Sequence, residues 1–399
     1  MARPTSVGPF PKYPRLHQPN NPKTLPGMHV LVIPDKFRGS LTAQQAADAI
    51  KMGLHRHHPD WTVASQPIAD GGEGTADLLT KATQGTIRSC TVADPLGRPV
   101  TARYGVSGDG QTAFVELAEA SGLNLLAPNE RNPLNTSTFG SGKLILDALE
   151  TGVTEIVLCI GGSATNDAGI GIATALGFQF FDAHDVPVLP IGNNLVRIAR
   201  IDRSNVLPAL HQVRIRVACD VTNPLYGPTG AAYVYAAQKG ANVQDQRKLD
   251  DGLRHLASLI EHEWNLSAAQ EPGSGAAGGV GFGARVFLRA RLEPGFAVVA
   301  QYTRLSEAIE QADLIITGEG KLDAQTLHGK AIRGIADLAR AANKPVVAFC
   351  GRLDLTPTQI QQLGLQQAIP ISPAHFTLNE ARRQAFILLC EAVAMAYDD

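Results

Sequence analysis

The feature that most constrains this fold is a recurring unit of apolar run, polar turn and helical pattern. In the first unit, four β-forming residues follow His29 and lead to Asp35, and helical spacing begins at Ala43 with Thr42 as the expected N-cap. Such an uninterrupted run is typical of a parallel strand buried on both faces. Turns of this kind occur at Asp35–Ser40, Asp70–Thr75, Gly161–Asp167, Asp220–Gly230 and Thr317–Asp323. The alternation predicts an α/β protein with parallel sheets.

One stretch, residues 87–118, breaks this rhythm. Its short alternating runs are separated by turns at Pro95–Gly97 and Gly108–Gly110, which predicts β-strands joined by turns. The length of 399 residues is enough for two domains. We therefore expect a Rossmann-like or flavodoxin-like domain over residues 28–85 and 290–399, with a second α/β domain inserted over 86–289. Residues 1–27 hold many prolines and no acidic side chain, so we expect a disordered extension there.

Composition excludes several classes of partner. The net charge is -2, which gives no electrostatic reason to expect nucleic acid or an anionic membrane. No apolar run approaches the roughly 18 residues that span a bilayer, and the first residues lack the apolar core of a secretory signal. The five cysteines are widely spaced and form no metal-binding motif. We expect a soluble, cytoplasmic protein with reduced thiols, which assembles as a homodimer.

The polar turns themselves suggest a chemistry. Glycine lets backbone N–H groups approach an anion, and the helix that follows places its positive end there. Carboxylates in the same turns can hold Mg²⁺ through oxygen. Together the five turns predict metal-assisted phosphate chemistry. Each turn alone also has a structural interpretation, because Asp-Gly-Gly commonly forms a simple turn and an Asp after a strand commonly caps a helix.

The sequence lacks the common nucleotide-binding and hydrolase motifs. Gly140–Lys143 and His328–Lys330 both fail the spacing of a P-loop, and the protein-kinase motifs are missing. Gly279–Ala284 fits only a relaxed dinucleotide fingerprint, and no strand clearly precedes it. A NAD-dependent dehydrogenase is therefore disfavoured.

In combination, the turns resemble the signatures of a known family. The matching segments, in chain order, are Ile33–Leu41, Ala69–Thr75, Glu119–Leu123, Gly161–Gly169, Cys219–Leu225, Gly275–Gly279, Thr317–Asp323 and His328–Lys330. They look like those of the type-1 glycerate kinases, and the resemblance runs from about residue 28 to the C-terminus. It implies ATP and Mg²⁺ as cofactors, D-glycerate as substrate and phosphorylation at the 2-hydroxyl. It also implies two α/β domains with the active site in the cleft between them.

The expected site residues follow from that chemistry. The carboxylate of glycerate calls for a cation, and Lys36 or Arg38 is placed to supply it, although Arg38 stands where the family is expected to have lysine. Candidates for the base or for a metal-holding acid are Asp167, Asp70, Asp35 and Asp220, and the sequence does not order them. Asp323 is a further candidate metal ligand. The expected nucleotide-binding residues are Gly161, Gly162, Ser163, Thr165, Asn166, Gly275, Gly278, Gly279, Gly318, Glu319 and Lys330. The glycines of 273–283 have an alternative role in close packing of a helix against a sheet.

Two alternatives for the function remain open at this point. The first is a kinase that forms 3-phosphoglycerate or acts on another hydroxy acid. The second is a non-catalytic, ligand-sensing α/β protein. Against the second, acids beside an anion site would repel the ligand of a pure anion binder.

Overall fold

The structure is a computed structural model, which describes residues 27–66, 68, 71–324, 326–328, 331–373 and 375–398. The described chain forms two compact units. Unit 2 is Asp70–Tyr302, and unit 1 combines the residues before it with Thr303–Asp399. The predicted extension over residues 1–27 lies outside the described residues apart from Gly27. No helix of the described part is long and apolar enough to span a membrane.

Unit 1 is built on a five-stranded parallel sheet of order β13-β12-β11-β1-β2. Its strands are β1 (His29–Pro34), β2 (Thr62–Ser65), β11 (Leu314–Leu322), β12 (Val346–Leu353) and β13 (Gln367–Pro370). Its helices are α1 (Ala43–His55), α10 (Leu305–Gln311), α11 (Ala331–Ala341), α12 (Pro357–Leu363), α13 (Leu378–Arg383) and α14 (Ala385–Ala396). Counted within the unit, this strand order is flavodoxin-like, one of the two parallel-sheet types expected from the sequence.

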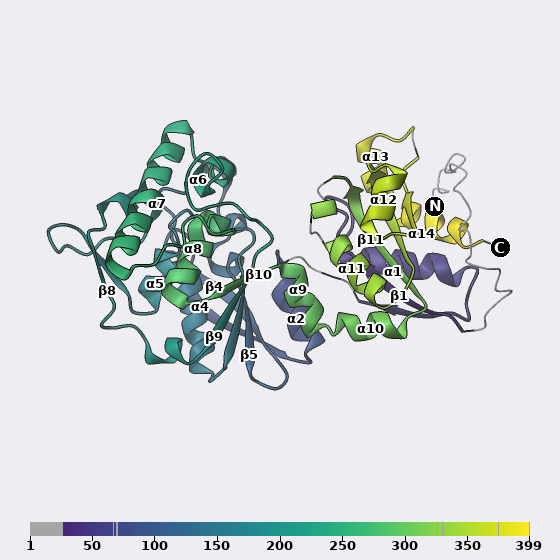
Figure 1. The fold of residues 1–399 in the computed structure, drawn as a ribbon, viewed down its shortest axis with the longest axis horizontal. Helices are drawn as coiled ribbons and strands as arrows, with labels where there is room; N and C mark the ends of the chain where they lie inside the picture. The colour runs from purple at the N-terminus through teal and green to yellow at the C-terminus, as the bar shows by residue number, and fades with distance from the viewer. Residues whose placement is uncertain are drawn as a thin grey trace, which may run out of the picture. The chain divides into compact units, whose positions relative to one another are not determined.

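The core of unit 1 explains why β1 is apolar throughout. Val30 and Val32 pack under α1 and α14, which come from opposite ends of the chain and lie together in Figure 1. Leu31 and Ile33, on the other face of the strand, are buried as well. The predicted N-cap is confirmed, because the Thr42 side chain accepts the N–H of Gln45 in a reciprocal capping box.

Unit 2 has a six-stranded mixed sheet of order β10-β9-β6-β5-β4-β3. Its strands are β3 (Thr86–Ala93), β4 (Pro99–Val106), β5 (Thr112–Glu116), β6 (Glu155–Cys159), β9 (Arg214–Ala218) and β10 (Arg291–Glu293), with a separate hairpin of β7 (Gln179–Phe181) and β8 (Arg200–Asp202). Its helices are α2 (Thr75–Ala82), α3 (Ala118–Ser121), α4 (Phe139–Glu150), α5 (Ile170–Ala175), α6 (Ala231–Tyr235), α7 (Val243–Trp264), α8 (Ala276–Leu288) and α9 (Gly295–Tyr302). β5, β6, β9 and β10 run parallel, whereas β3, β4 and β5 form the antiparallel stretch expected from the alternating pattern.

The boundaries of unit 2 differ from the expected 86 and 289. α2 packs against β4, β5 and α9, so it belongs to unit 2 although its sequence continues the rhythm of unit 1. α9 contacts β9, which extends the unit at its other end to Tyr302. The shift in the sequence from strand–helix alternation to short alternating runs therefore marks the start of the antiparallel strands and not the start of the unit.

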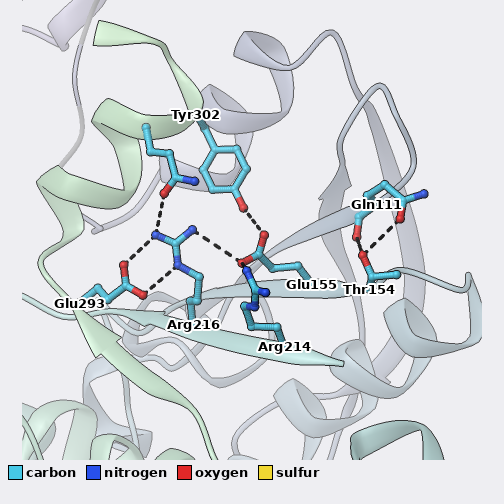
Figure 2. A network of polar contacts seen from close by, with 8 residues as sticks. Gln111, Thr154, Glu155, Arg214, Arg216, Glu293 and Tyr302 are labelled. Atoms are coloured by element: carbon cyan, nitrogen blue, oxygen red, sulfur yellow. Dashed lines mark hydrogen bonds and ion pairs between the residues drawn. The ribbon is translucent and has the colours of Figure 1, made fainter. Parts of the chain in front are cut away.

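Polar side chains hold α9 to the sheet of unit 2 (Figure 2). The Arg216 guanidinium donates to both carboxylate oxygens of Glu293, at 2.9 and 2.7 Å, and to the Gln301 side-chain oxygen at 2.9 Å. The Tyr302 hydroxyl donates to Glu155 at 2.8 Å. Because Gln301 and Tyr302 end α9, these bonds fix the last turn of unit 2 just before the chain enters unit 1.

Candidate active site

In unit 2, the parallel strands deliver the predicted turns to one edge of the sheet. β6 leads into Gly161–Asp167, β9 leads into Asp220, and β10 leads into Gly295. The carboxyl ends of parallel strands are where α/β proteins bind ligands. Within unit 2, the structure therefore brings these turns to one edge of the sheet.

A fourth glycine-rich segment lies across the same edge. A methyl group on Gly71 would lie 3.1 Å from the Ala218 side chain, and one on Gly161 would lie 3.0 Å from the Cα of Gly72. The Gly71–Thr75 turn is therefore in close backbone contact with the ends of β6 and β9. Asp70, which precedes this turn, lies outside the described residues.

Glu116 anchors that segment, and the sequence reasoning missed it. Its side chain, buried at the end of β5, accepts the N–H of Ala76 at 2.8 Å in the first turn of α2. Burial raises the pKa of Glu116, although the hydrogen bonds from Ala76 and Gly74 oppose the rise. An acid that closes an otherwise apolar strand was the signal available in the sequence.

Asp167, a candidate for the base or for a metal-holding acid, is enclosed by the chain. Its side chain is 0% exposed, and its oxygens accept hydrogen bonds from Thr138 N and Oγ1, both at 2.8 Å, from Gly169 N at 3.1 Å and from Gly171 N at 3.3 Å. Burial raises the pKa of Asp167, and these four bonds oppose the rise. No part of Asp167 is exposed, so the geometry indicates a structural role in which this residue joins the starts of α4 and α5.

The rest of the turn divides into an accessible half and an enclosed half. Gly162 is exposed, Gly161 is half-buried and Ser163 is 8% exposed. Thr165 and Asn166 are fully buried, and the Thr165 hydroxyl and both polar atoms of the Asn166 side chain have no hydrogen-bond partner among the described residues. A ligand that approaches this edge therefore meets Gly161–Ser163 first.

A buried lysine, also missed by the sequence reasoning, lies beneath this turn. Lys239 ends the short 3₁₀ turn Ala237–Lys239 and is 2% exposed. Its ammonium donates to the Ser163 hydroxyl oxygen and to the Thr165 carbonyl oxygen, both at 2.7 Å. Burial lowers the pKa of Lys239 to about 7, and the negative charge of Asp167 opposes that shift. No carboxylate of the described chain lies within ion-pairing distance of the ammonium.

The lowered pKa of Lys239 should make stability rise with pH. Between about 7 and the ordinary value of 10.5 the unfolded chain binds a proton that the folded protein releases, so the free energy of unfolding increases with pH. We expect the wild type to gain about 1 kcal/mol per pH unit over a Lys239→Met variant between pH 8 and 9. Urea unfolding at each pH measures this difference. A difference that stays constant would mean that Lys239 keeps its proton when folded.

The glycine run of residues 273–283 is packed, as the structural alternative expected. A methyl group on Gly275 would lie 2.2 Å from the Pro224 carbonyl oxygen, one on Gly278 would lie 2.1 Å from that of Thr165, and one on Gly279 would lie 2.9 Å from the Cα of Ala168. All three glycines are buried. Their contacts support close packing of the start of α8 behind the Gly161–Asp167 turn and do not form an open phosphate cradle.

Asp220 occupies an accessible position at the same edge. Its residue is exposed, and one carboxylate oxygen accepts the N–H of Gly295 at 2.8 Å. This bond joins the end of β9 to the start of α9. An exposed carboxylate of this kind can serve as an oxygen ligand of a metal ion.

In unit 1, the carboxyl ends of β1 and β11 carry the predicted residues. The strand order reverses between these two strands, and such a switch point is the usual ligand site of a flavodoxin-like sheet. Asp35 and Lys36 are half-buried at the end of β1, and Arg38 is exposed. The Lys36 N–H donates to the Asp35 carboxylate at 2.7 Å, and the Asp35 N–H donates to the Gly318 carbonyl at 2.8 Å.

On β11, the predicted residues differ in their surroundings. Glu319 is 9% exposed, and its carboxylate accepts a hydrogen bond from the Thr326 hydroxyl, with 2.8 Å between the two oxygens. Asp323 pairs with the Lys321 ammonium at 3.0 Å. A methyl group on Gly318 would lie 2.5 Å from the Phe349 carbonyl oxygen, so this glycine is required by strand packing. Lys330 lies outside the described residues.

Similarity to known proteins covers nearly the whole chain. The sequence profile of the glycerate kinase family matches residues 30–397. A glycerate kinase of Halalkalibacterium halodurans is 45% identical over 91% of this chain and 96% of its own length. The glycerate 2-kinase of Escherichia coli K12 is 42% identical over 92% of this chain and 96% of its own.

A solved structure agrees with the fold. A protein of Salmonella typhimurium LT2 that is named glycerate kinase 2 superposes with a TM-score of 0.81 at 39% identity. The superposition covers 92% of this chain and 96% of the Salmonella chain. Both units of the present chain are therefore included in the similarity.

Proposed function

Because this chain belongs to the glycerate kinase family, we propose that it transfers the γ-phosphoryl group of ATP to the 2-hydroxyl of D-glycerate, giving 2-phosphoglycerate. The observation that carries the proposal is the 42% identity with the E. coli glycerate 2-kinase over 96% of that enzyme. Identity at this level over nearly the full length includes both units of the chain.

In unit 1, we assign recognition of glycerate to the end of β1. Lys36 and Arg38 offer positive charge at the switch point of the sheet, and the planar guanidinium of Arg38 suits a carboxylate. Asp35 lies beside them with its carboxylate already accepting the N–H of Lys36. It is one of two candidates that we assign as acceptor of the hydroxyl proton. The other is Asp70 of unit 2, which lies outside the described residues.

In unit 2, we assign the phosphate contacts of ATP to the accessible half of the Gly161–Asp167 turn. The exposed Gly162 allows an anion to come close to the backbone, and Ser163 adds a hydroxyl. Phosphoryl transfer depends mainly on positioning the reactants and on neutralising their charge. This turn lies at the carboxyl edge of the sheet, where its backbone N–H groups could contact a phosphate.

We propose two carboxylates as candidates for Mg²⁺ binding, Asp220 in unit 2 and Asp323 in unit 1. Their donor chemistry fits, since Mg²⁺ commonly takes one or two carboxylates together with substrate phosphates and waters. When bound, the ion would neutralise negative charge on the phosphates. Asp323 also pairs with the Lys321 ammonium, and Asp220 is exposed and accepts the Gly295 N–H.

The activity is tested by incubating the protein with ATP, Mg²⁺ and D-glycerate and following ADP release, with the product identified by NMR. We expect 2-phosphoglycerate. Formation of 3-phosphoglycerate would keep the kinase and overturn the position of phosphorylation. Turnover with another hydroxy acid in place of glycerate would replace the substrate, and no turnover across such a panel would favour a ligand-sensing protein. The cytoplasmic location and the homodimer remain predictions, and light scattering would test the latter.

An Asp220→Asn variant should need far more Mg²⁺. The amide oxygen can still accept the Gly295 N–H, so folding is preserved, but the charge that holds the ion is lost. We expect activity at 1 mM Mg²⁺ to fall about 100-fold, with the Mg²⁺-dependent rise in melting temperature shifted to higher concentration. Asp251→Asn, the same change on the exposed face of α7, is the matched control. Equal Mg²⁺ dependence in both variants would remove Asp220 from the metal site.

A further inference from the structure

The deepest cation of unit 2 lies directly beneath the accessible part of the Gly161–Asp167 turn. Lys239 is buried, and its ammonium reaches the turn at two points, the Ser163 hydroxyl oxygen and the Thr165 carbonyl oxygen. An unpaired charge at such depth is costly to fold. The rest of the turn is already held by Asp167 and by the packed glycines of α8, so packing alone does not require an ammonium here.

We propose that Lys239 is a positioning residue of the kinase, which orients the Ser163 hydroxyl as a hydrogen-bond donor to an anionic substrate oxygen at the carboxyl edge of the unit 2 sheet. The inference rests on the proposed function. It goes beyond that function because it assigns a role to a buried residue and makes the Ser163 hydroxyl a hydrogen-bond donor to the ligand.

The first step of the argument is the direction of one hydrogen bond. When it is protonated, the Lys239 side chain can only donate, so the Ser163 oxygen is then the acceptor in their 2.7 Å contact. The hydroxyl proton of Ser163 is then left for a different acceptor. Among the described residues, no acceptor for that proton is found. The hydroxyl is therefore kept ready to donate to a ligand.

The second step concerns the backbone. The same ammonium donates to the Thr165 carbonyl oxygen, which is enclosed by the backbone of Gly278. The Lys239 side chain thus fixes both the orientation of the Ser163 hydroxyl and the position of the Thr165 carbonyl group. The Ser163 side chain, at 8% exposure, is the polar group through which this arrangement reaches the surface.

The third step concerns charge. The ammonium adds a positive charge behind the turn, and the exposed Gly162 and half-buried Gly161 allow an anion to come close. The ligand chemistry is therefore an anionic oxygen that accepts a hydrogen bond. Two sources could supply it, a phosphate of ATP or the carboxylate of glycerate, and kinetics with each substrate varied separately distinguishes them.

The test compares Lys239→Met, Ser163→Ala and the double variant with the wild type. Methionine keeps the approximate volume and removes the buried charge, a change that is often neutral for stability. We expect the melting temperature of Lys239→Met to stay within about 5 °C of the wild type while kcat/KM falls at least about 30-fold. Ser163→Ala should lose about 10-fold. The double variant should be no worse than Lys239→Met alone, because both changes remove the same oriented proton.

The substrate whose KM or kcat/KM changes identifies the anion that Ser163 contacts. A change confined to ATP assigns a phosphate, and a change confined to glycerate assigns the carboxylate. Lys248→Met, on the exposed face of α7, is the matched control and should behave as the wild type.

Several results would overturn the proposal. Wild-type kinetics of Ser163→Ala would do so even if Lys239→Met failed to fold, and so would losses that multiply in the double variant. If the wild type showed no glycerate-dependent turnover, the proposed function would fail, and calorimetric binding of ADP and of glycerate to the same variants would still decide the role of Lys239. Unchanged binding of both ligands in Ser163→Ala would then count against it.

Discussion

An Asp167→Ala variant should unfold about 4 kcal/mol more easily than the wild type. The substitution removes the acceptor for four donors, three of them backbone N–H groups, in a place that water does not reach. Each buried donor left without a partner costs about 1–3 kcal/mol, and the removal of a charge that was itself costly to bury offsets part of the sum. Urea unfolding followed by circular dichroism measures the loss.

Two further variants make this result specific. Asp167→Asn keeps one acceptor oxygen, which can still serve Thr138 and Gly171, so we expect a smaller loss of about 2 kcal/mol. Asp251→Ala, on the exposed face of α7, should change stability by less than about 0.5 kcal/mol. A stable Asp167→Ala protein with its activity abolished would contradict the structural role and restore the catalytic interpretation.

A Gly278→Ala variant should lose about as much stability, for a steric reason. Its φ of +69° is unfavourable for alanine, and the new methyl group would lie 2.1 Å from the Thr165 carbonyl oxygen. Strain of this kind costs about 1–3 kcal/mol, and displacement of a backbone that cannot move freely adds to it. We expect a total of about 4 kcal/mol in chemical unfolding.

Gly152→Ala separates the two causes. Gly152 has a similar φ of +84°, but nothing lies within 4 Å of an added methyl group. This control should therefore lose only about 1 kcal/mol, from backbone strain alone. Equal losses of stability at both positions would show that the backbone behind the Gly161–Asp167 turn can move to accommodate a methyl group. The glycines of 275–279 would then not be required for close packing.

The sequence predicted the strands and their turns well because strong local signals mark them. β1 and β6 are mostly apolar, β9 alternates arginine with apolar residues, and each is followed within two residues by Asp or Gly. β11 continues through its turn to Leu322. The parallel sheet of unit 1 also agreed with the prediction, which had left the Rossmann-like and flavodoxin-like types open. The end of β10 and the helix α9 had no comparable signal, because three residues of strand followed by Pro294 look like a loop in the sequence.

Site residues were harder to predict, because burial is a property of the assembled chain. A sequence places Asp167 in a turn, but it does not show that Thr138, from 29 positions away, closes over its carboxylate. Lys239 follows a short helix in a stretch without periodicity, where a lysine is expected to be solvated. Its neighbours in space, Ser163 and Thr165, lie more than 70 positions earlier.

The divided sequence of unit 1 has a consequence for the order of events during synthesis. β1 is made first, yet its neighbour β11 lies 284 positions further along the chain, as the bond between Thr317 and Ile33 shows. Until β11 leaves the ribosome, β1 has only β2 beside it. Unit 2 is continuous and can fold in that interval, and its first and last helices, α2 and α9, contact each other. A folded unit 2 therefore shortens the effective loop that β1 and β11 must close, which lowers the entropic cost of completing unit 1.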